Sequence, residues 1–253
     1  MASWSSKRKF AYTSVFTIIA VVIFVAVFLL IFYDKPTCFD GTQNQDESGV
    51  DCGGVCEKVC SFQAVKPNII WSRSFKVSDG IYNAIAYIEN PNIKAEALAV
   101  PYVFKIFDER NILISEKKGQ IDIPANKTFP IFESFIETGN RVPKFTFFEF
   151  LKDPSWLSIT QETPPNPLKT ISYNLTSSPS PKLEAIIENS SLEAIYDVAV
   201  VAILYDENDN AFASSQTFLD KIDRESRQTA VFTWPENFPS SPAKVEILTT
   251  IPN

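Results

Sequence analysis

The stretch VAVVAILYDENDNAF, Val198–Phe212, carries the clearest structural signal in this 253-residue chain. Its first half is rich in β-branched and aliphatic residues, which favour strands. Ile203 and Leu204 must point to opposite faces of such a strand, because strand side chains alternate. Asp206 and Asp209 then supply a turn, since short polar side chains hydrogen-bond to their own backbone and tolerate left-handed angles. The stretch therefore predicts a strand that ends in a tight turn.

The same pattern occurs in the first half of the chain. Ala84–Leu113 aligns with Leu183–Phe212: the letters Ile-Glu-Asn at 88–90 recur at 187–189, and Phe-Asp-Glu at 107–109 matches Tyr-Asp-Glu at 205–207. Short runs of β-branched and aromatic residues, separated by Asn, Asp, Pro and Ser, follow in both halves. Such spacing is typical of an antiparallel sandwich. The repeat indicates that one β-rich unit has been duplicated.

We therefore expect an all-β ectodomain of two tandem antiparallel, immunoglobulin-like β-sandwiches, at residues 62–160 and 170–253. Each has about the length usual for a small sandwich. Between them QETPPNPLK, residues 161–169, contains three prolines and predicts an extended, fairly stiff linker.

The second half also resembles a known family. VAVVAILYDENDNAFASSQTFLDKIDRESRQTAVFTWP, which begins at Val198, is similar to the FxLYD-type domain of bacterial envelope proteins, with AILYDEN at the signature position. The resemblance is good over residues 180–250 and weaker over 80–150, where YVFKIFDERN stands in place of the signature. It implies an immunoglobulin-like sandwich of seven strands, a turn at YDEN and no known catalysis. The family carries no established ligand, so the resemblance bears on the fold more than on function.

An uncharged apolar run, Phe10–Tyr33, precedes both halves. Its 24 residues are enough to cross the hydrocarbon core as a helix and exceed the apolar region of a cleaved signal peptide. We therefore expect an uncleaved transmembrane helix over residues 10–33. Residues 1–9 carry a formal charge of +3 while the whole chain carries −7, which leaves −10 for the rest. The positive-inside rule then places the short tail in the cytoplasm and the bulk of the chain outside.

All four cysteines lie just after this run, in residues 34–61: Cys38, Cys52, Cys56 and Cys60. Disulfides persist on the oxidising side of a membrane, and a segment this short needs them because it cannot bury enough surface. We therefore expect two disulfides, although spacing does not choose among the three pairings that four cysteines allow. A zinc site is the weaker alternative, because histidines and paired Cys-x2-Cys knuckles are absent.

Carboxylates are interleaved with these cysteines and suggest a calcium site. The candidate ligands are Asp40, Asn44, Asp46, Glu47 and Asp51, whose oxygens are of the type that calcium prefers. The spacing does not fit an EF-hand loop, and a solvated acidic loop is the alternative. The segment also resembles a module of bacterial surface and secreted proteins with the pattern CxDGxxNxxExxVDCGGxC, whose role is poorly defined. We expect a rigid, protease-resistant collar between the membrane helix and the sandwiches.

Several functions are disfavoured by what the sequence lacks. The chain contains no histidine, which excludes Ser-His-Asp and Cys-His nucleophilic sites and the commonest general base. No glycine-rich phosphate loop is present, and the Asp-Glu pairs fall at predicted turns, so we expect no enzymatic activity. The acidic ectodomain is a poor match for nucleic acid, which attracts basic surfaces.

We expect a non-enzymatic, single-pass membrane protein whose sandwiches act as a structural or protein-interaction module in an exocytoplasmic assembly. Its partners would be the lipid bilayer and a protein of the cell envelope, and no cofactor is expected apart from the calcium above. The alternative is a cell-surface binding protein that recognises a carbohydrate, protein or lipid through its loops. In that case Trp156, in KDPSWLS, and Phe238, in ENFPSSP, are the aromatic residues expected at loop tips.

Overall fold

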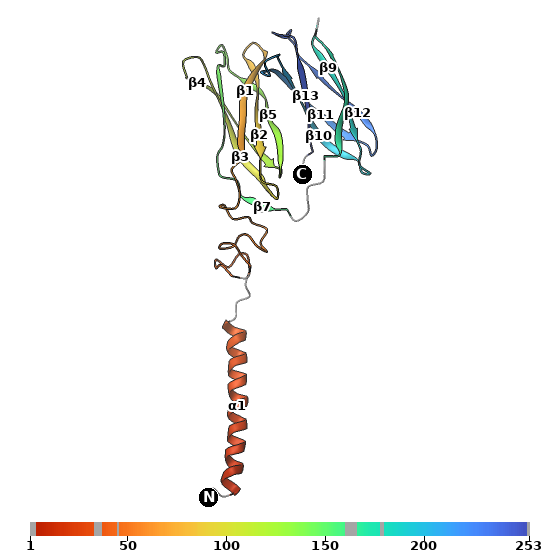
Figure 1. The fold of residues 1–253 in the computed structure, drawn as a ribbon. Coiled ribbons are helices and arrows are strands. Elements are labelled where there is room, and N and C mark those ends of the chain that lie inside the picture. Colours follow the sequence, from red (N-terminus) through yellow and green to blue (C-terminus); the bar gives the residue numbers. More distant parts are fainter. Residues whose placement is uncertain (1–3, 33–36, 45, 160–165, 178–179, 252–253) are drawn as a thin grey trace. The chain divides into compact units, whose positions relative to one another are not determined.

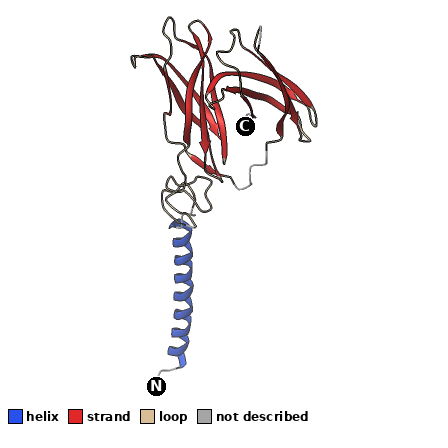
Figure 2. Cartoon of the chain, turned by 45° about the horizontal axis from the view of Figure 1, so that its top comes forward, coloured by secondary structure: helices blue, strands red, loops and turns tan. Residues whose placement is uncertain are grey.

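The computed structural model of this chain describes residues 4–32, 37–44, 46–159, 166–177 and 180–251 (Figure 1). The chain divides into two compact units, Met1–Val55 and Cys56–Asn253. The first unit contains one helix and a loop segment, and the second contains the named strands of the described residues. Figure 2 shows this division by element type, with the described residues between the helix and the first strand drawn as loop.

Helix α1, Trp4–Phe32, contains the predicted span up to its last residue, since Tyr33 lies outside the described residues. Within it Arg8–Phe28 has a mean hydropathy of 2.5 and no residue buried against the rest of the chain, so it is long and apolar enough to cross a membrane. The hydroxyls of Thr13, Ser14 and Thr17 donate to backbone carbonyls four residues earlier, at 2.8–2.9 Å. These bonds satisfy the hydroxyls within the helix, as an apolar surrounding requires.

Among the described residues, the first half of the second unit has seven strands, all paired antiparallel. One sheet has the order β1-β2-β5 and the other β4-β3-β6, with β7 also paired to β3. The strands are β1 Asn68–Ser78, β2 Ile81–Asn90, β3 Ala95–Phe107, β4 Leu113–Ile123, β5 Lys127–Glu137, β6 Phe145–Phe150 and β7 Trp156–Ser158.

The second half repeats this order with six strands among the described residues. Its sheets are β8-β9-β12 and β11-β10-β13, so each strand from β8 to β13 takes the place of one from β1 to β6. The strands are β8 Leu168–Thr176, β9 Lys182–Asn189, β10 Ile195–Tyr205, β11 Ala211–Ile222, β12 Arg227–Thr233 and β13 Lys244–Thr250. Most of the predicted linker, residues 161–165, lies outside the described residues, and its last two residues already belong to β8.

Each half encloses one hydrophobic core between its two sheets. In the first half Ile88, Phe104 and Ile131, from strands of both sheets, belong to one cluster of buried side chains. In the second half Leu183 and Leu204 do the same. Burying a side chain of this size contributes roughly 1.5–3 kcal/mol, so these two cores are the main stabilising features of the halves.

One buried asparagine ends the equivalent strand in each half. Asn90 is 1% exposed, and its Nδ2 donates to the carbonyl oxygens of Ala95 at 2.9 Å and Pro124 at 2.8 Å. Asn189 is fully buried, and its Nδ2 donates to Glu193 at 2.8 Å and to two further carbonyls at 3.1 and 3.2 Å. A buried amide of this kind satisfies loop carbonyls that cannot reach water. The repeated Ile-Glu-Asn sequence therefore places a buried asparagine, Asn90 or Asn189, that holds the nearby loops through hydrogen bonds to their carbonyls. We call this arrangement the clamp.

The repeated aspartates shape the turn after β3 and β10. Asp108 Oδ1 accepts backbone N–H bonds from the residues two and four positions ahead, at 2.9 and 3.0 Å. Asp206 Oδ1 does the same at 2.9 and 2.8 Å. These bonds, chiefly the one from four residues ahead, hold the pKa of both carboxyls below the usual range. Asn111 and Asp209 take left-handed backbone angles, with φ of 57° and 56°. These turns agree with the predicted role of short polar residues here.

We predict that Asn90→Ala and Asn189→Ala each lower the free energy of unfolding by about 1–3 kcal/mol, because each leaves buried carbonyls without a donor. The measurement is chemical denaturation of the full chain in detergent. Asn174→Ala, on an exposed stretch of β8, is the matched control and should change stability by less than about 0.5 kcal/mol. Equal effects at all three positions would contradict the clamp.

Candidate functional site

The outer faces of two sheets pack against each other between the halves of the second unit. Ile85 of β2 and Ile203 of β10 are both fully buried in this contact. The whole cluster consists of Phe75, Ile85, Val201, Ile203, Tyr205 and Ala211, with Trp71, Phe132 and Leu248 partly buried around it. Figure 1 shows the sheet containing β1, β2 and β5 next to that containing β13, β10 and β11. Both central strands are therefore buried on their two faces.

A glutamate lies between two tyrosines within this interface. Tyr87 Oη and Tyr205 Oη donate to the two carboxylate oxygens of Glu246, each at 2.7 Å. Tyr87 comes from the first half and the other two residues from the second, so the carboxylate bonds across the interface and within its own half. Burial, followed by these hydrogen bonds to a carboxylate, raises the pKa of both tyrosines. Hydrogen bonds to a charged acceptor are among the stronger ones in proteins.

Charged side chains connect the halves at the rim of the same interface. Arg73 of β1 donates to the Ala211 carbonyl at 2.9 Å and to Asn210 Oδ1 at 3.3 Å. Lys76 pairs with Glu236 at 3.0 Å. The Lys76 pair is substantially exposed and contributes little, whereas Arg73 satisfies a backbone carbonyl next to the apolar cluster.

An open groove of about 300 Å³ lies along this rim and is lined by both halves. Ser72, Thr146 and Phe212 are among its lining residues. Ser72 Oγ donates to the Thr146 carbonyl at 2.7 Å, and Thr146 Oγ1 donates to Ser74 Oγ at 3.0 Å. Because these polar groups already bond to one another, the groove offers a small ligand little specific recognition.

We predict that Glu246→Ala lowers the free energy of unfolding by about 1.5–3 kcal/mol, because it removes two charge-assisted bonds and leaves the Tyr87 and Tyr205 hydroxyls without their acceptor. Denaturation of the full chain in detergent measures the change. Glu236→Ala removes an exposed carboxylate from the same interface and should cost less than about 1 kcal/mol. If the two variants lose the same stability, Glu246 does not hold the halves together.

In the first unit, the carboxylates of the cysteine segment bind their own loop. Asp40 accepts bonds from the backbone N–H of Thr37 and Thr42, both at 2.9 Å, and from Asn44 Nδ2 at 2.8 Å. These bonds, chiefly the one from Thr37, hold the pKa of Asp40 far below the usual range. Both carboxylate oxygens of Asp51 lie 3.1 Å from the Gly41 backbone nitrogen. Two of the five predicted calcium ligands, Asp40 and Asp51, therefore already accept hydrogen bonds from donors of their own loop.

The other three predicted ligands, Asn44, Asp46 and Glu47, differ in their exposure and in their hydrogen bonds. Glu47 is 7% exposed and accepts a bond from the Asn44 backbone N–H at 3.3 Å. Asn44 Oδ1 is buried and accepts no hydrogen bond from the residues that the structure describes. Asp46 is exposed, and its carbonyl oxygen would lie 1.7 Å from a Cβ placed on Gly54, whose φ is +61°. Calcium binding here stays a prediction, while Gly54 is required by both space and backbone angle.

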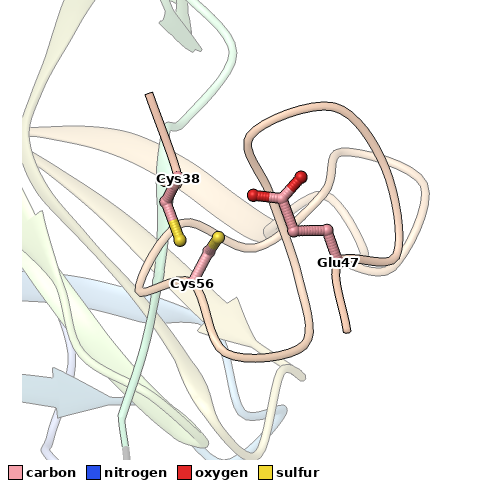
Figure 3. Close-up of side chains that lie close together, drawn as sticks. All are labelled: Cys38, Glu47 and Cys56. Atoms are coloured by element: carbon pink, nitrogen blue, oxygen red, sulfur yellow. The ribbon is translucent and has the colours of Figure 1, made fainter. Parts of the chain in front are cut away.

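The four cysteines form two disulfides, as expected. The sulfur atoms of Cys38 and Cys56 and a carboxylate oxygen of Glu47 lie within 4.8 Å of one another (Figure 3). Metal binding by cysteine needs free thiolates, and both of these cysteines are disulfide-bonded. The group therefore gives no support to a metal centre.

The two aromatic residues expected at loop tips are packed instead. Trp156 begins β7, is 5% exposed and belongs to the first core. Phe238 packs partly buried against the second core, with its ring centroid 5.2 Å from that of Trp234 and 5.8 Å from that of Phe212. Trp156 is therefore not at an exposed loop tip, because its ring belongs to the core. Phe238 does lie in the loop between β12 and β13, but its ring is partly buried rather than exposed.

We predict that reduction, rather than calcium removal, opens the cysteine segment to protease. The disulfides constrain a loop with few buried residues, and the Asp40 and Asp51 carboxylates already have protein donors. The measurement is the rate of cleavage between residues 37 and 60 in the full chain, untreated, reduced, or treated with a calcium chelator. Unchanged cleavage after reduction would contradict the collar, and faster cleavage after chelation would show that calcium binds.

Comparison of the chain with protein-family models and with curated proteins finds no match. The resemblance to the FxLYD-type domain and to the cysteine module therefore stays a prediction.

Sequence reasoning missed the residues that join the halves. Tyr87, Tyr205 and Glu246 lie far apart in the sequence, and no local pattern says that they meet. One signal was available: Val200–Leu204 is apolar at every position, which is typical of a strand covered on both faces rather than one.

Proposed function

We propose that this chain is a non-enzymatic, single-pass membrane protein that holds a rigid pair of β-sandwiches outside the cytoplasm as a structural or protein-interaction module. Each half would be an immunoglobulin-like sandwich. The observation that carries the proposal is the interface around Ile85, Ile203 and Glu246, which joins the two halves through a common apolar cluster. A packed pair of domains presents its surfaces in a fixed arrangement, as an assembly subunit requires.

The location outside the cytoplasm is supported by two independent features. Helix α1 is long and apolar enough to span a membrane, and the chain has two disulfides, which persist in oxidising compartments. The basic residues Lys7, Arg8 and Lys9 precede the apolar run, which favours a cytoplasmic N-terminus. The lipid bilayer would be one partner, through residues 10–33, and a protein of the envelope the other. The rest of the chain is acidic, so we do not expect it to bind nucleic acid.

The proposal predicts a specific topology. Protease applied to cells stripped of their outer layers should remove a tag at the C-terminus and leave a tag at the N-terminus intact. The full chain should stay in the membrane fraction after alkaline extraction, because α1 anchors it. Recovery of a soluble chain that begins after residue 33 would instead show that the helix is a cleaved signal, and protection of the C-terminal tag would reverse the orientation.

The interaction role is tested in the same cells by lysine crosslinking, purification through the N-terminal tag and mass spectrometry. We expect reproducible intermolecular crosslinks from lysines of the second unit. A chain that crosslinks to no protein, neither another copy nor a different one, would contradict the proposed role while leaving its topology unaffected.

A further inference from the structure

Three large apolar side chains are exposed at one end of the first half, where the chain enters the second unit. Phe62, Val65 and Ile93 are 72%, 61% and 69% exposed. Phe62 lies in a turn closed by a bond from the Gln63 N–H to the Cys60 carbonyl at 2.8 Å. Single exposed apolar residues are common on protein surfaces, but a group of them at one place marks a contact with an apolar partner. We call Phe62, Val65 and Ile93 the apolar end.

The side chain of Asn92 holds two of these residues close together. Asn92 Oδ1 accepts a bond from the Val65 N–H at 2.8 Å, and its Nδ2 donates to the Val65 carbonyl at 2.7 Å. Ile93 follows Asn92 directly, so its exposed side chain is fixed near that of Val65. The Asn92 N–H in turn donates to Oδ1 of the clamp residue Asn90 at 3.1 Å. Polar bonds therefore position these apolar side chains, which remain exposed.

Backbone bonds to β7 fix the segment that carries Phe62. The Val59 N–H donates to the Trp156 carbonyl at 2.9 Å, and the Ser158 N–H donates to the Glu57 carbonyl at 2.6 Å. Figure 1 shows β7 at the end of the first half that this segment enters. The apolar end is therefore part of the folded second unit rather than a free loop.

Covalent connections keep the apolar end close to the membrane that α1 would span. Helix α1 ends at Phe32, and Cys38 follows six residues later. All four cysteines are disulfide-bonded, so Cys38 is joined directly to one of the other three, at positions 52, 56 and 60. Six extended residues span at most about 20 Å, and a disulfide joins Cα atoms roughly 6 Å apart. Whichever pairing forms, the lipid surface is held within reach of the apolar end.

Lysines stand next to two of the apolar residues. Lys66 follows Val65, Lys94 follows Ile93, and both lysines are exposed. Lys66 pairs with Asp153 at 2.7 Å, but both side chains are 79% exposed, so this ion pair holds Lys66 weakly. A lysine beside an apolar side chain extends its ammonium group to lipid phosphates while the apolar group enters the acyl chains. This combination favours a phospholipid surface over a purely apolar groove of a protein.

We propose that the apolar end rests on the exocytoplasmic leaflet of the membrane, with its three side chains among the upper acyl chains and the two lysines at the phosphates. Removal of apolar surface from water drives the contact. The contact orients the pair of sandwiches above the membrane, which a tether alone does not do. The inference deepens the proposed function, and it rests on that function in requiring the second unit to lie outside a membrane that α1 spans.

The test is photocrosslinking of the full chain in nanodiscs of phosphatidylcholine and phosphatidylglycerol. The photoreactive residue p-benzoylphenylalanine replaces Phe62, Ile93 or Val142, and mass spectrometry detects lipid adducts at each position. Val142 is the control, because it is 70% exposed and its loop is bonded to the β1–β2 turn, at the other end of β2 from Ile93. We expect lipid adducts at positions 62 and 93 and none at 142. No lipid adducts at 62 and 93, equal yields at 142, or adducts to a second copy in place of lipid would overturn the proposal.

A second measurement separates a docked end from chance collisions of a tethered unit. With the probe at position 62, Val65→Asp or Ile93→Asp should lower the yield of lipid adducts by about fivefold or more, because a carboxylate is costly to place among acyl chains. Val142→Asp should leave the yield unchanged, and matching thermal unfolding shows that the variants remain folded. Equal yields in all variants would overturn the docking while the chain remains in the nanodisc through α1. A chain that does not enter nanodiscs at all overturns both this inference and the proposed function.

Discussion

The contact between the outer faces of β1-β2-β5 and β11-β10-β13 is the constraint on which the rest of the second unit depends. A sheet needs only one buried face to be stable, and each half has a core of its own. The second buried face, with Ile85 and Ile203 at its centre, adds apolar burial that neither half can obtain alone. Tandem domains with small polar interfaces move relative to one another, whereas an apolar interface with a bridging carboxylate holds them in one arrangement.

Much of this fold can be predicted from the sequence because the signals are local. The apolar run, the strand-forming segments and the Asp-containing turns each depend on residues close together in the chain. The Ile-Glu-Asn repeat is also a local signal, but the hydrogen bonds that its asparagine makes are not local. Only the structure shows that the amide of Asn90 or Asn189 satisfies carbonyls up to 34 residues away.

Long-range contacts explain what sequence reasoning missed. Trp156 sits among Pro, Ser and Lys in a stretch typical of an exposed loop, yet three residues pair with β3 and place its ring in the core. Glu246 is the one acidic residue of β13, and its two tyrosine donors come from β2 and β10. The carboxylates of the cysteine segment were identified as metal ligands by type, but Asp40 and Asp51 accept bonds from nearby backbone donors. Composition alone does not distinguish these two uses of an acidic side chain.

The central claim is that the two halves form one cooperative body. Calorimetry of the full chain in detergent tests it directly, through the ratio of the calorimetric to the van't Hoff enthalpy of unfolding. If the shared interface couples the halves, the second unit should unfold in one transition with a ratio close to one. Two resolved transitions, or a single one with a ratio close to two, would show that the halves unfold independently and would contradict the account.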